Sequence, residues 1–267
     1  MMPMTKPFLK YLGGKSRLLH ELLPRIPSSF NKFSEPFCGG AALFFALQPQ
    51  KAEISDINLP LIITYNVVKD DIEGLLNLLR YHDFMYSRHN DYYYIMRDYF
   101  NHASITNREL AAAFIFLNKT CYNGLWRVNK SGEMNVPKGK YKNPKIYDED
   151  TLRLASSALQ GVNIVQKDYH IIEKRRNDFF YFDPPYAGTF SQYDSSGFTE
   201  EDHKYLRSVC DEIQYAGGFF MVSNSDSPFV RNEYRHYNIE EIYARRSASC
   251  DGTQRGKTKE LIVRNYE

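Results

Sequence analysis

An unbroken apolar run, Phe179 to Phe182, is followed directly by the segment Asp183-Pro184-Pro185-Tyr186. A short apolar run without alternation is typical of a strand that is buried on both faces, as in a parallel sheet. Proline fixes φ and has no N–H, so the segment after the strand is stiff and its carbonyls point outward. Open α/β sheets bind ligands at the carboxyl ends of their strands, which is where this segment lies. A carboxylate, carbonyl acceptors and an aromatic ring can hold a planar amine there, although a strand that merely ends in prolines has the same pattern.

Helix and strand patterns alternate along most of the chain. Strands are predicted at residues 32–37, 51–55, 163–165, 179–182, 219–222, 240–244 and 261–263. Helices are predicted at 18–23, at 41–47 and from Thr199, where Thr199 and Asp202 have the spacing of a capping box. Strands that alternate with helices predict an α/β fold, a mostly parallel sheet with helices on both faces.

Residues 59–158 interrupt this alternation. Helical patterns at 61–79, 92–100 and 108–118 follow one another without strands, and a polar stretch without clear periodicity comes next. We therefore predict two domains: an α/β domain formed by residues 1–58 and 159–267, and a mostly helical domain inserted at residues 59–158.

The composition excludes several classes of protein. No apolar run reaches 18 residues, and residues 1–10 lack the apolar core of a signal peptide, so neither a leader nor a membrane span is predicted. The four cysteines are scattered and form no CxxC pair, which predicts neither a disulfide framework nor a zinc site. We expect a soluble protein of a reducing compartment.

The positive charge of the chain is concentrated in one stretch. Between Lys119 and Lys145 there are seven basic residues and one acid, whereas the whole chain has a net charge of only +2. Aromatic residues, Tyr122, Trp126 and Tyr141, alternate with these lysines and arginines. A run of charge is often only a solvated face, but this mixture of cations and rings favours the binding of nucleic acid.

A second candidate site begins at Glu35-Pro36-Phe37-Cys38-Gly39-Gly40, at a predicted junction between strand and helix. Glycines there let the backbone approach a ligand, and the helix N-terminus favours negative groups. Asp56 ends the next strand, where an acid commonly binds a ribose diol, and Asp168 ends another. Ordinary turn aspartates have the same positions, but together these features favour a cofactor that contains a nucleoside.

The segment Lys10-Tyr11-Leu12-Gly13-Gly14-Lys15-Ser16 is not a P-loop. The pattern of that loop requires glycine at position 9, where this chain has Leu9. Gly13 and Gly14 instead predict a tight turn that brings Tyr11 and Lys15 to a ligand.

Several motifs together resemble the Dam-type, or alpha-group, site-specific DNA adenine-N6 methyltransferases. In chain order these are Tyr11-Leu12-Gly13-Gly14-Lys15, Glu35-Pro36-Phe37-x-Gly39, Asp56-Ile57-Asn58, the stretch Tyr122 to Asn129 with Gly132 to Tyr141, Asp183-Pro184-Pro185-Tyr186, and Arg245-Arg246 with Arg255-Gly256-Lys257-x-Lys259-Glu260-Leu261. The resemblance covers residues 6–265. The chain departs from the family pattern at Ala41, which replaces the second glycine of the F-x-G-x-G motif.

The resemblance implies a Rossmann-like methyltransferase sheet with an inserted target-recognition domain. It also implies that a methyl group passes from S-adenosylmethionine to N6 of adenine in double-stranded DNA, leaving S-adenosylhomocysteine, without a metal. The adenine would be flipped out of the helix. Its implied catalytic residues are Asp183, Pro184, Pro185 and Tyr186, and its implied cofactor-binding residues are Tyr11, Lys15, Phe37, Gly39, Asp56, Asp168 and Asp183.

The resemblance also implies a DNA-binding set and the target GATC. Tyr122 would enter the base stack, Asn123 would help hold the displaced partner base, and Arg127 has the fork geometry for guanine. Lys10 would read another guanine, and Lys140 would bind phosphate. Leu125 and Pro137 would contact a thymine methyl group, although simple packing of the loop explains these two residues nearly as well.

Four other functions compete with this interpretation. A cytosine-C5 methyltransferase needs a nucleophilic cysteine, typically after proline, and no cysteine here follows one. A protein-glutamine or RNA methyltransferase would usually have Asn in place of Asp183 and would not need the basic recognition insert. A cytosine-N4 methyltransferase stays an alternative, as does a DNA-binding regulator with an inactive methyltransferase fold. For the adenine enzyme we expect a cytoplasmic, nucleoid-associated monomer in a bacterial or phage-infected cell, with a restriction endonuclease as a genetic partner and no membrane contact.

Overall fold

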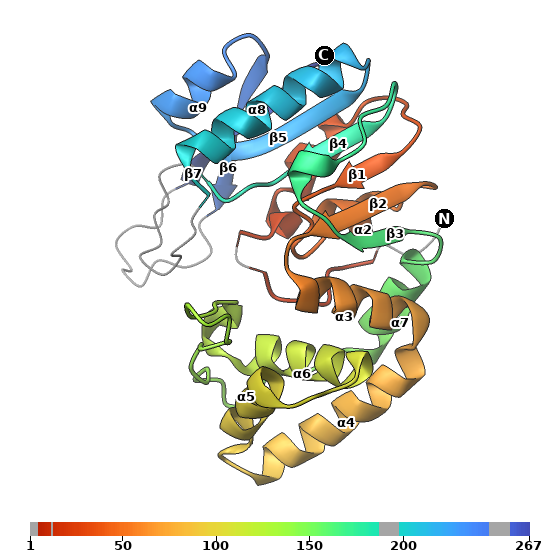
Figure 1. Ribbon diagram of the computed structural model, residues 1–267, viewed down its shortest axis with the longest axis vertical. Helices are drawn as coiled ribbons and strands as arrows, with labels where there is room; N and C mark the ends of the chain where they lie inside the picture. Colours follow the sequence, from red (N-terminus) through yellow and green to blue (C-terminus); the bar gives the residue numbers. More distant parts are fainter. Residues whose placement is uncertain (1–4, 12, 187–197, 246–256) are drawn as a thin grey trace. The chain divides into compact units, whose positions relative to one another are not determined.

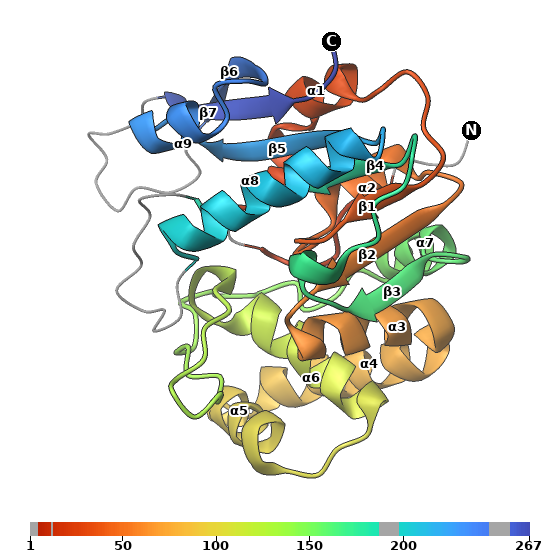
Figure 2. The same cartoon turned by 45° about the horizontal axis from the view of Figure 1, so that its top comes forward.

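The computed structural model describes residues 5–11, 13–186, 198–245 and 257–267 (Figures 1 and 2). Four motif residues, Leu12, Arg246, Arg255 and Gly256, lie outside the described residues. The chain forms two compact units. The helical unit comprises Met1–Gly14, Gly39–Gln48 and Asp56–Gln166, and the sheet unit comprises Lys15–Cys38, Pro49–Ser55 and Lys167–Glu267. The domain limits predicted from the sequence stay a prediction.

The strands form one seven-stranded sheet in the order β3-β2-β1-β4-β5-β7-β6. Their bounds are Phe33–Glu35 (β1), Ala52–Asp56 (β2), Asn163–Gln166 (β3), Phe179–Phe182 (β4), Phe219–Ser225 (β5), Asn238–Arg245 (β6) and Lys257–Arg264 (β7). Strand β1 is parallel to β2 and β4, and β4 is parallel to β5, whereas β7 runs antiparallel to β5 and β6. This mixed α/β sheet confirms the predicted Rossmann-like methyltransferase fold.

Strand β4 lies at the centre of the sheet unit, and all four of its side chains are buried. It pairs with β5 in the register Phe179↔Phe219 to Phe182↔Val222. Helix α8 (Glu200–Tyr215) lies along β5 (Figures 1 and 2) and begins with the predicted capping box of Thr199 and Asp202. The sheet unit also contains α1 (Leu19–Leu22) and α9 (Pro228–Glu233), together with short 3-10 turns at Lys15–Arg17, Leu23–Arg25 and Tyr169–Ile171.

The helical unit is organised around α6 (Asn107–Thr120), which is almost wholly buried and contacts α3, α4 and α5. Its other helices are α2 (Ala42–Leu47), α3 (Leu59–Asp70), α4 (Ile72–Arg88), α5 (Tyr92–His102) and α7 (Glu149–Ala158). The helix predicted over 61–79 is in fact two helices. The chain turns at Asp71, whose φ is −144° and whose carboxylate accepts a hydrogen bond from the N–H of Gly74 and so caps α4.

No helix in the described ranges is long and apolar enough to cross a membrane.

Candidate active site and DNA-binding segment

The end of β4 delivers Asp183 into a buried ion pair. The Nζ atom of Lys15 lies 2.6 Å from Oδ1 of Asp183, and the side chains are only 5% and 19% exposed. Burial raises the pKa of Asp183 above its ordinary value, and the Lys15 ammonium opposes that rise. Among the described residues, no hydrogen bond reaches the second oxygen, Oδ2. This oxygen can therefore accept a hydrogen bond from a bound amino group.

Tyr186, the last residue of the segment, contacts both Lys15 and Glu260. Its ring centroid lies 4.8 Å from Nζ of Lys15, a cation–π contact, and its hydroxyl donates a hydrogen bond to the carboxylate of Glu260. Burial, together with the negative charges of Asp183 and Glu260, raises the pKa of Tyr186 far above its ordinary value. The phenol therefore stays neutral. Pro184, between these two side chains, is buried, and Pro185 is exposed.

In the sheet unit, Phe37 packs against Tyr169, and Asp168 precedes Tyr169 in the chain. The ring of Phe37 packs at a centroid distance of 5.0 Å from Tyr169 and also contacts Phe182 and Phe198. The carboxylate of Asp168 accepts the N–H of His170 at 2.9 Å and lies 2.8 Å from Nδ1 of the same residue. Asp168 is 45% exposed, so it can still accept a hydrogen bond from a ligand.

Tyr11, Gly39 and Asp56 form a cluster in the helical unit. The Asp56 carboxylate accepts the N–H of Gly39 at 3.1 Å and the N–H of Asn58 at 3.0 Å. Burial nevertheless raises the pKa of Asp56, although these N–H donors oppose the rise. Gly39 has φ +43°, and a Cβ added there would lie 2.7 Å from the ring of Tyr11. Only glycine fits this turn without displacing the ring.

Lys10, which precedes the turn at Gly13 and Gly14, is hydrogen-bonded to the end of α6. The backbone N–H of Lys10 donates to Oδ1 of Asn118 at 2.8 Å, and Nδ2 of Asn118 donates back to the Lys10 carbonyl at 2.7 Å. The Lys10 ammonium donates to the Lys119 carbonyl and lies 4.1 Å from the centroid of the Tyr141 ring. Lys10 thereby lies beside the basic segment, although more than 100 residues separate them in the chain.

Within the basic segment, two isolated bridges, Cys121↔Lys138 and Val128↔Met134, hold the loop closed. The predicted DNA-binding side chains of this loop differ in exposure. Arg127 is fixed by Asn135, whose Oδ1 accepts from its Nε at 2.7 Å. Leu125 is half-buried, whereas the others are exposed: Tyr122, Asn123, Pro137 and Lys140.

The profile of the D12 class N6 adenine-specific DNA methyltransferases matches residues 11–248. The chain belongs to this family.

Three relatives match along nearly their whole length. A type II methyltransferase of Lactococcus lactis, M1.LlaDCHI, is 39% identical over 98% of this chain and 95% of its own. A second, M.MjaIII of Methanocaldococcus jannaschii, is 38% identical over 98% of this chain and 99% of its own. The DNA adenine methylase of Escherichia coli K12 is 31% identical over 98% and 96% of the two chains. This chain is therefore a DNA adenine-N6 methyltransferase by family.

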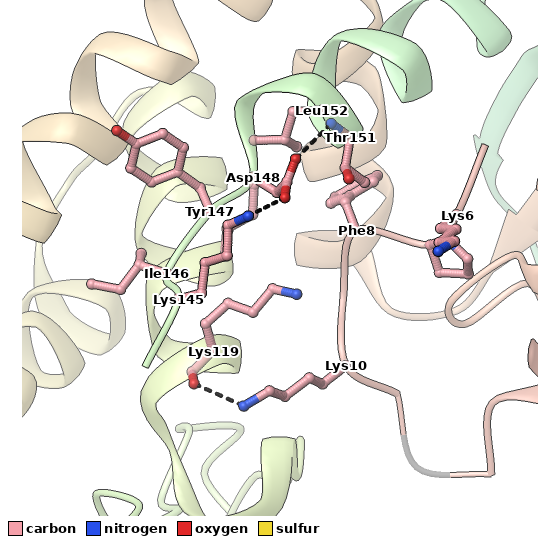
Figure 3. A pocket seen from close by; sticks show the side chains of 12 residues that line it. Lys6, Phe8, Lys10, Lys119, Lys145, Ile146, Tyr147, Asp148, Thr151 and Leu152 are labelled. Atoms are coloured by element: carbon pink, nitrogen blue, oxygen red, sulfur yellow. Dashed lines mark hydrogen bonds and ion pairs between the residues drawn. The ribbon is translucent and has the colours of Figure 1, made fainter. Parts of the chain in front are cut away.

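Sequence reasoning missed a basic cavity in the helical unit of this methyltransferase (Figure 3). The cavity, about 340 Å³ in volume, is lined by four lysines, Lys6, Lys10, Lys119 and Lys145. Lys145 is paired with Asp148. In the described part of the chain, the Lys119 ammonium has no hydrogen-bond or ion-pair partner. Burial, and next the charge of Lys10, lower the pKa of Lys119 to about 8. An anion bound beside this ammonium would stabilise its charged form.

Sequence reasoning also missed the contact of Glu260. The motif Lys257-x-Lys259-Glu260-Leu261 pointed to this residue but did not indicate its partner. Tyr186 lies 74 residues away in the chain, so no local pattern relates the two side chains.

Proposed function

We propose that this protein transfers the methyl group of S-adenosylmethionine to N6 of an adenine in double-stranded DNA, within the sequence GATC. The observation that carries the proposal is the arrangement at the end of β4. The carboxylate of Asp183, paired with Lys15, stands beside the ring of Tyr186. The family to which the chain belongs favours adenine over cytosine as the base that is methylated.

Asp183 and Pro184 would activate the amino group. The lone pair of an exocyclic amine is delocalised into the ring, so adenine N6 is a poor nucleophile. The Asp183 carboxylate and the Pro184 carbonyl would accept its two N–H bonds and draw the nitrogen toward tetrahedral geometry, which frees the lone pair. Tyr186 would stack on the ring, and Pro185 would keep the segment rigid. Catalysis would come from positioning and electrostatics.

The residues proposed to bind S-adenosylmethionine fit its groups. Asp56 would accept hydrogen bonds from the ribose hydroxyls, and Asp168 from the adenine amino group. Gly39 leaves room where a side chain would meet Tyr11. When bound, the cofactor supplies an electrophilic methyl group on a sulfonium. The full proposed set is Tyr11, Lys15, Phe37, Gly39, Asp56, Asp168 and Asp183.

The DNA side of the proposal rests on the basic segment. Tyr122, the first residue of the 3-10 turn Tyr122–Gly124, is exposed and would enter the base stack as the target adenine flips out. Asn123 would bind the displaced partner base. Arg127, already oriented by Asn135, would read guanine. The other proposed contacts are Lys10 to a second guanine, Leu125 and Pro137 to a thymine methyl group, and Lys140 to phosphate.

The lysines that line the cavity would bind phosphates of the DNA backbone. Lys119 and Lys145 belong to the same basic stretch as Arg127 and Lys140. The Lys119 ammonium is partly buried and is flanked by Lys10, so a DNA phosphate beside it would relieve the repulsion between the two cations.

The names of two relatives bear on the genetic partner of this protein. Two relatives at 39% and 38% identity are named type II methyltransferases, which favours a restriction endonuclease as the genetic partner of this chain. We expect the enzyme to act as a monomer on the DNA of the cytoplasm. Sequencing the flanking genes and measuring the mass of the protein–DNA complex would test both points.

The decisive experiment measures the transfer of radiolabelled methyl from S-adenosylmethionine to two duplexes, one with GATC and one with the same bases scrambled. We expect label only on the adenine of GATC. Label on both duplexes would contradict the specificity, and label on cytosine would contradict the reaction. No label on either would leave a different target sequence or a DNA-binding regulator with an inactive methyltransferase fold.

A further inference from the structure

Glu260 occupies a defined position at the edge of the sheet. It lies on β7 opposite Ser225, the last residue of β5, and opposite Ile242 of β6. Because β5 runs parallel to β4, the end of β5 lies on the same edge as Asp183, which follows β4. Neighbouring Lys259 is bound elsewhere, to Glu241 at 2.9 Å. The register of an antiparallel strand thereby brings one carboxylate to the segment that follows β4.

The carboxylate of Glu260 has a specific partner there. Among the described residues, its hydrogen bond comes from the hydroxyl of Tyr186. A charged acceptor makes a stronger and more directional hydrogen bond than a neutral one. Since the phenol stays protonated, the bond persists over the working pH range of an enzyme. The far end of the Tyr186 side chain is therefore anchored.

The anchor connects Tyr186 to Asp183. Lys15 contacts both the ring face of Tyr186 and the carboxylate of Asp183, at 4.8 Å from the ring centroid and 2.6 Å from Oδ1. A ring released from Glu260 could rotate about its side-chain torsions and move Lys15 with it. The orientation of the stacking ring and that of the acceptor carboxylate are thus set by one network.

We propose that Glu260 is a positioning residue for methyl transfer: by accepting the hydrogen bond of the Tyr186 hydroxyl, it holds the ring in the plane in which the flipped adenine stacks. This inference rests on the proposed function of Tyr186. Glu260 itself does not touch the reacting atoms. It would instead fix the ring of Tyr186 before the adenine binds. This matters because misplacement of a reacting group by about 1 Å can cost about 100-fold in rate.

The test compares the single-turnover methylation rates of Glu260→Ala, Glu260→Gln and Tyr186→Phe with the rate of the wild-type protein. We expect Glu260→Ala and Tyr186→Phe each to lower the rate by about 10- to 100-fold, with little change in the KM for S-adenosylmethionine. Glu260→Gln keeps an acceptor and should recover most of the rate. The double variant Glu260→Ala/Tyr186→Phe should be no slower than either single variant, because both remove the same bond.

The matched control is Glu241→Ala, which removes a carboxylate of the same sheet that pairs with Lys259 and Arg231. Its rate should equal that of the wild type. The proposal is overturned if Glu260→Ala keeps the full rate, if the losses in the double variant multiply, or if Glu260→Gln is as slow as Glu260→Ala.

A second readout does not depend on activity. In protein labelled with 13Cζ-tyrosine, the Tyr186 resonance is identified by its loss in Tyr186→Phe. Glu260→Ala should shift that resonance, and Glu260→Gln should shift it less. An unchanged resonance in Glu260→Ala overturns the proposal, even for a protein that folds poorly or is inactive. Absence of methyl transfer by the wild type would instead contradict the proposed function.

Discussion

The ammonium of Lys15 and the carboxylate of Asp183 form an ion pair at 2.6 Å in which neither side chain is more than 19% exposed. The two residues are far apart in the chain, yet each compensates the buried charge of the other. Removing one partner of such a pair leaves an unpaired buried charge, which is strongly destabilising. The same pair sets the ionisation of the acceptor on which the proposed reaction depends.

Replacing Asp183 by alanine should abolish methylation. The variant loses the acceptor for the amino group, and we expect a fall of about 100- to 1,000-fold or more in the single-turnover rate. DNA affinity should stay close to that of the wild type, because no proposed DNA contact is removed. A gel-shift assay and a methyl-transfer assay on the same duplex measure the DNA affinity and the methylation rate. Turnover at the wild-type rate would contradict the assigned chemistry, and a melting curve would show what the unpaired Lys15 costs.

Two substitutions should move the acid limb of the pH–rate profile in opposite directions. The positive charge of Lys15 lowers the pKa of Asp183, and the negative charge of Glu260 raises it. The proposed reaction needs the Asp183 carboxylate ionised, so we expect activity to be lost as the pH falls through the pKa of Asp183. Lys15→Met should therefore move the acid limb to higher pH, and Glu260→Gln to lower pH, with Tyr186 neutral throughout. Profiles at saturating S-adenosylmethionine that shift in the same direction would count against this assignment.

Gly39→Ala should weaken the binding of S-adenosylmethionine. The added Cβ would lie 2.7 Å from the Tyr11 ring, which must move. Gly132→Ala is the control, since Gly132 also has a positive φ, of +81°, but its Cβ would meet nothing within 4 Å. Both variants incur the backbone strain, of about 1 kcal/mol, and only Gly39→Ala should also raise the dissociation constant of the cofactor in calorimetry. Equal affinities in the two variants would place Tyr11 outside the cofactor site.

Arg127→Ala should relax sequence choice at one base pair. Its guanidinium is held by Asn135 at 2.7 Å, and loss of a bidentate contact to guanine costs about 1–3 kcal/mol of discrimination. The comparison is kcat/KM on GATC and on sites altered at a single base pair. Lys130→Ala, an exposed cation of the same loop, serves as the control and should weaken all sites alike. Equal losses on every site with Arg127→Ala would make Arg127 a phosphate contact.

The affinity for DNA should fall as the pH rises through about 8. Burial lowers the pKa of Lys119 to about 8 from its ordinary 10.5, so the folded protein loses this positive charge between neutral pH and about pH 9. The same shift stabilises the fold as the pH rises from about 8 toward 10.5, because the folded protein no longer carries the buried charge whereas Lys119 of the unfolded chain stays protonated in water. Lys119→Arg keeps its charge throughout and should bind DNA equally at about pH 7 and about pH 9. A wild-type affinity that does not change over this interval would exclude Lys119 from the DNA contact.

Local patterns in the sequence predicted much of the fold. The apolar run Phe179–Phe182 is strand β4, the Thr199 capping box begins α8, and the ordered motifs indicated the family that the comparisons confirm. Each of these signals depends on residues that are neighbours in the chain. The break at Asp71 was missed because the helical periodicity continues through it, while the cap that makes the break is a single side-chain hydrogen bond.

The sequence by itself determined the class of sheet, the chemistry available at the end of β4 and the family, because strand burial, proline stiffness and motif order are local properties. Only the tertiary structure decided which groups meet. The pairing of Lys15 with Asp183, the anchoring of Tyr186 by Glu260 and the partial burial of Lys119 all depend on contacts between distant segments. Such contacts follow from strand register and helix packing, which bring together side chains that no pattern along the chain relates.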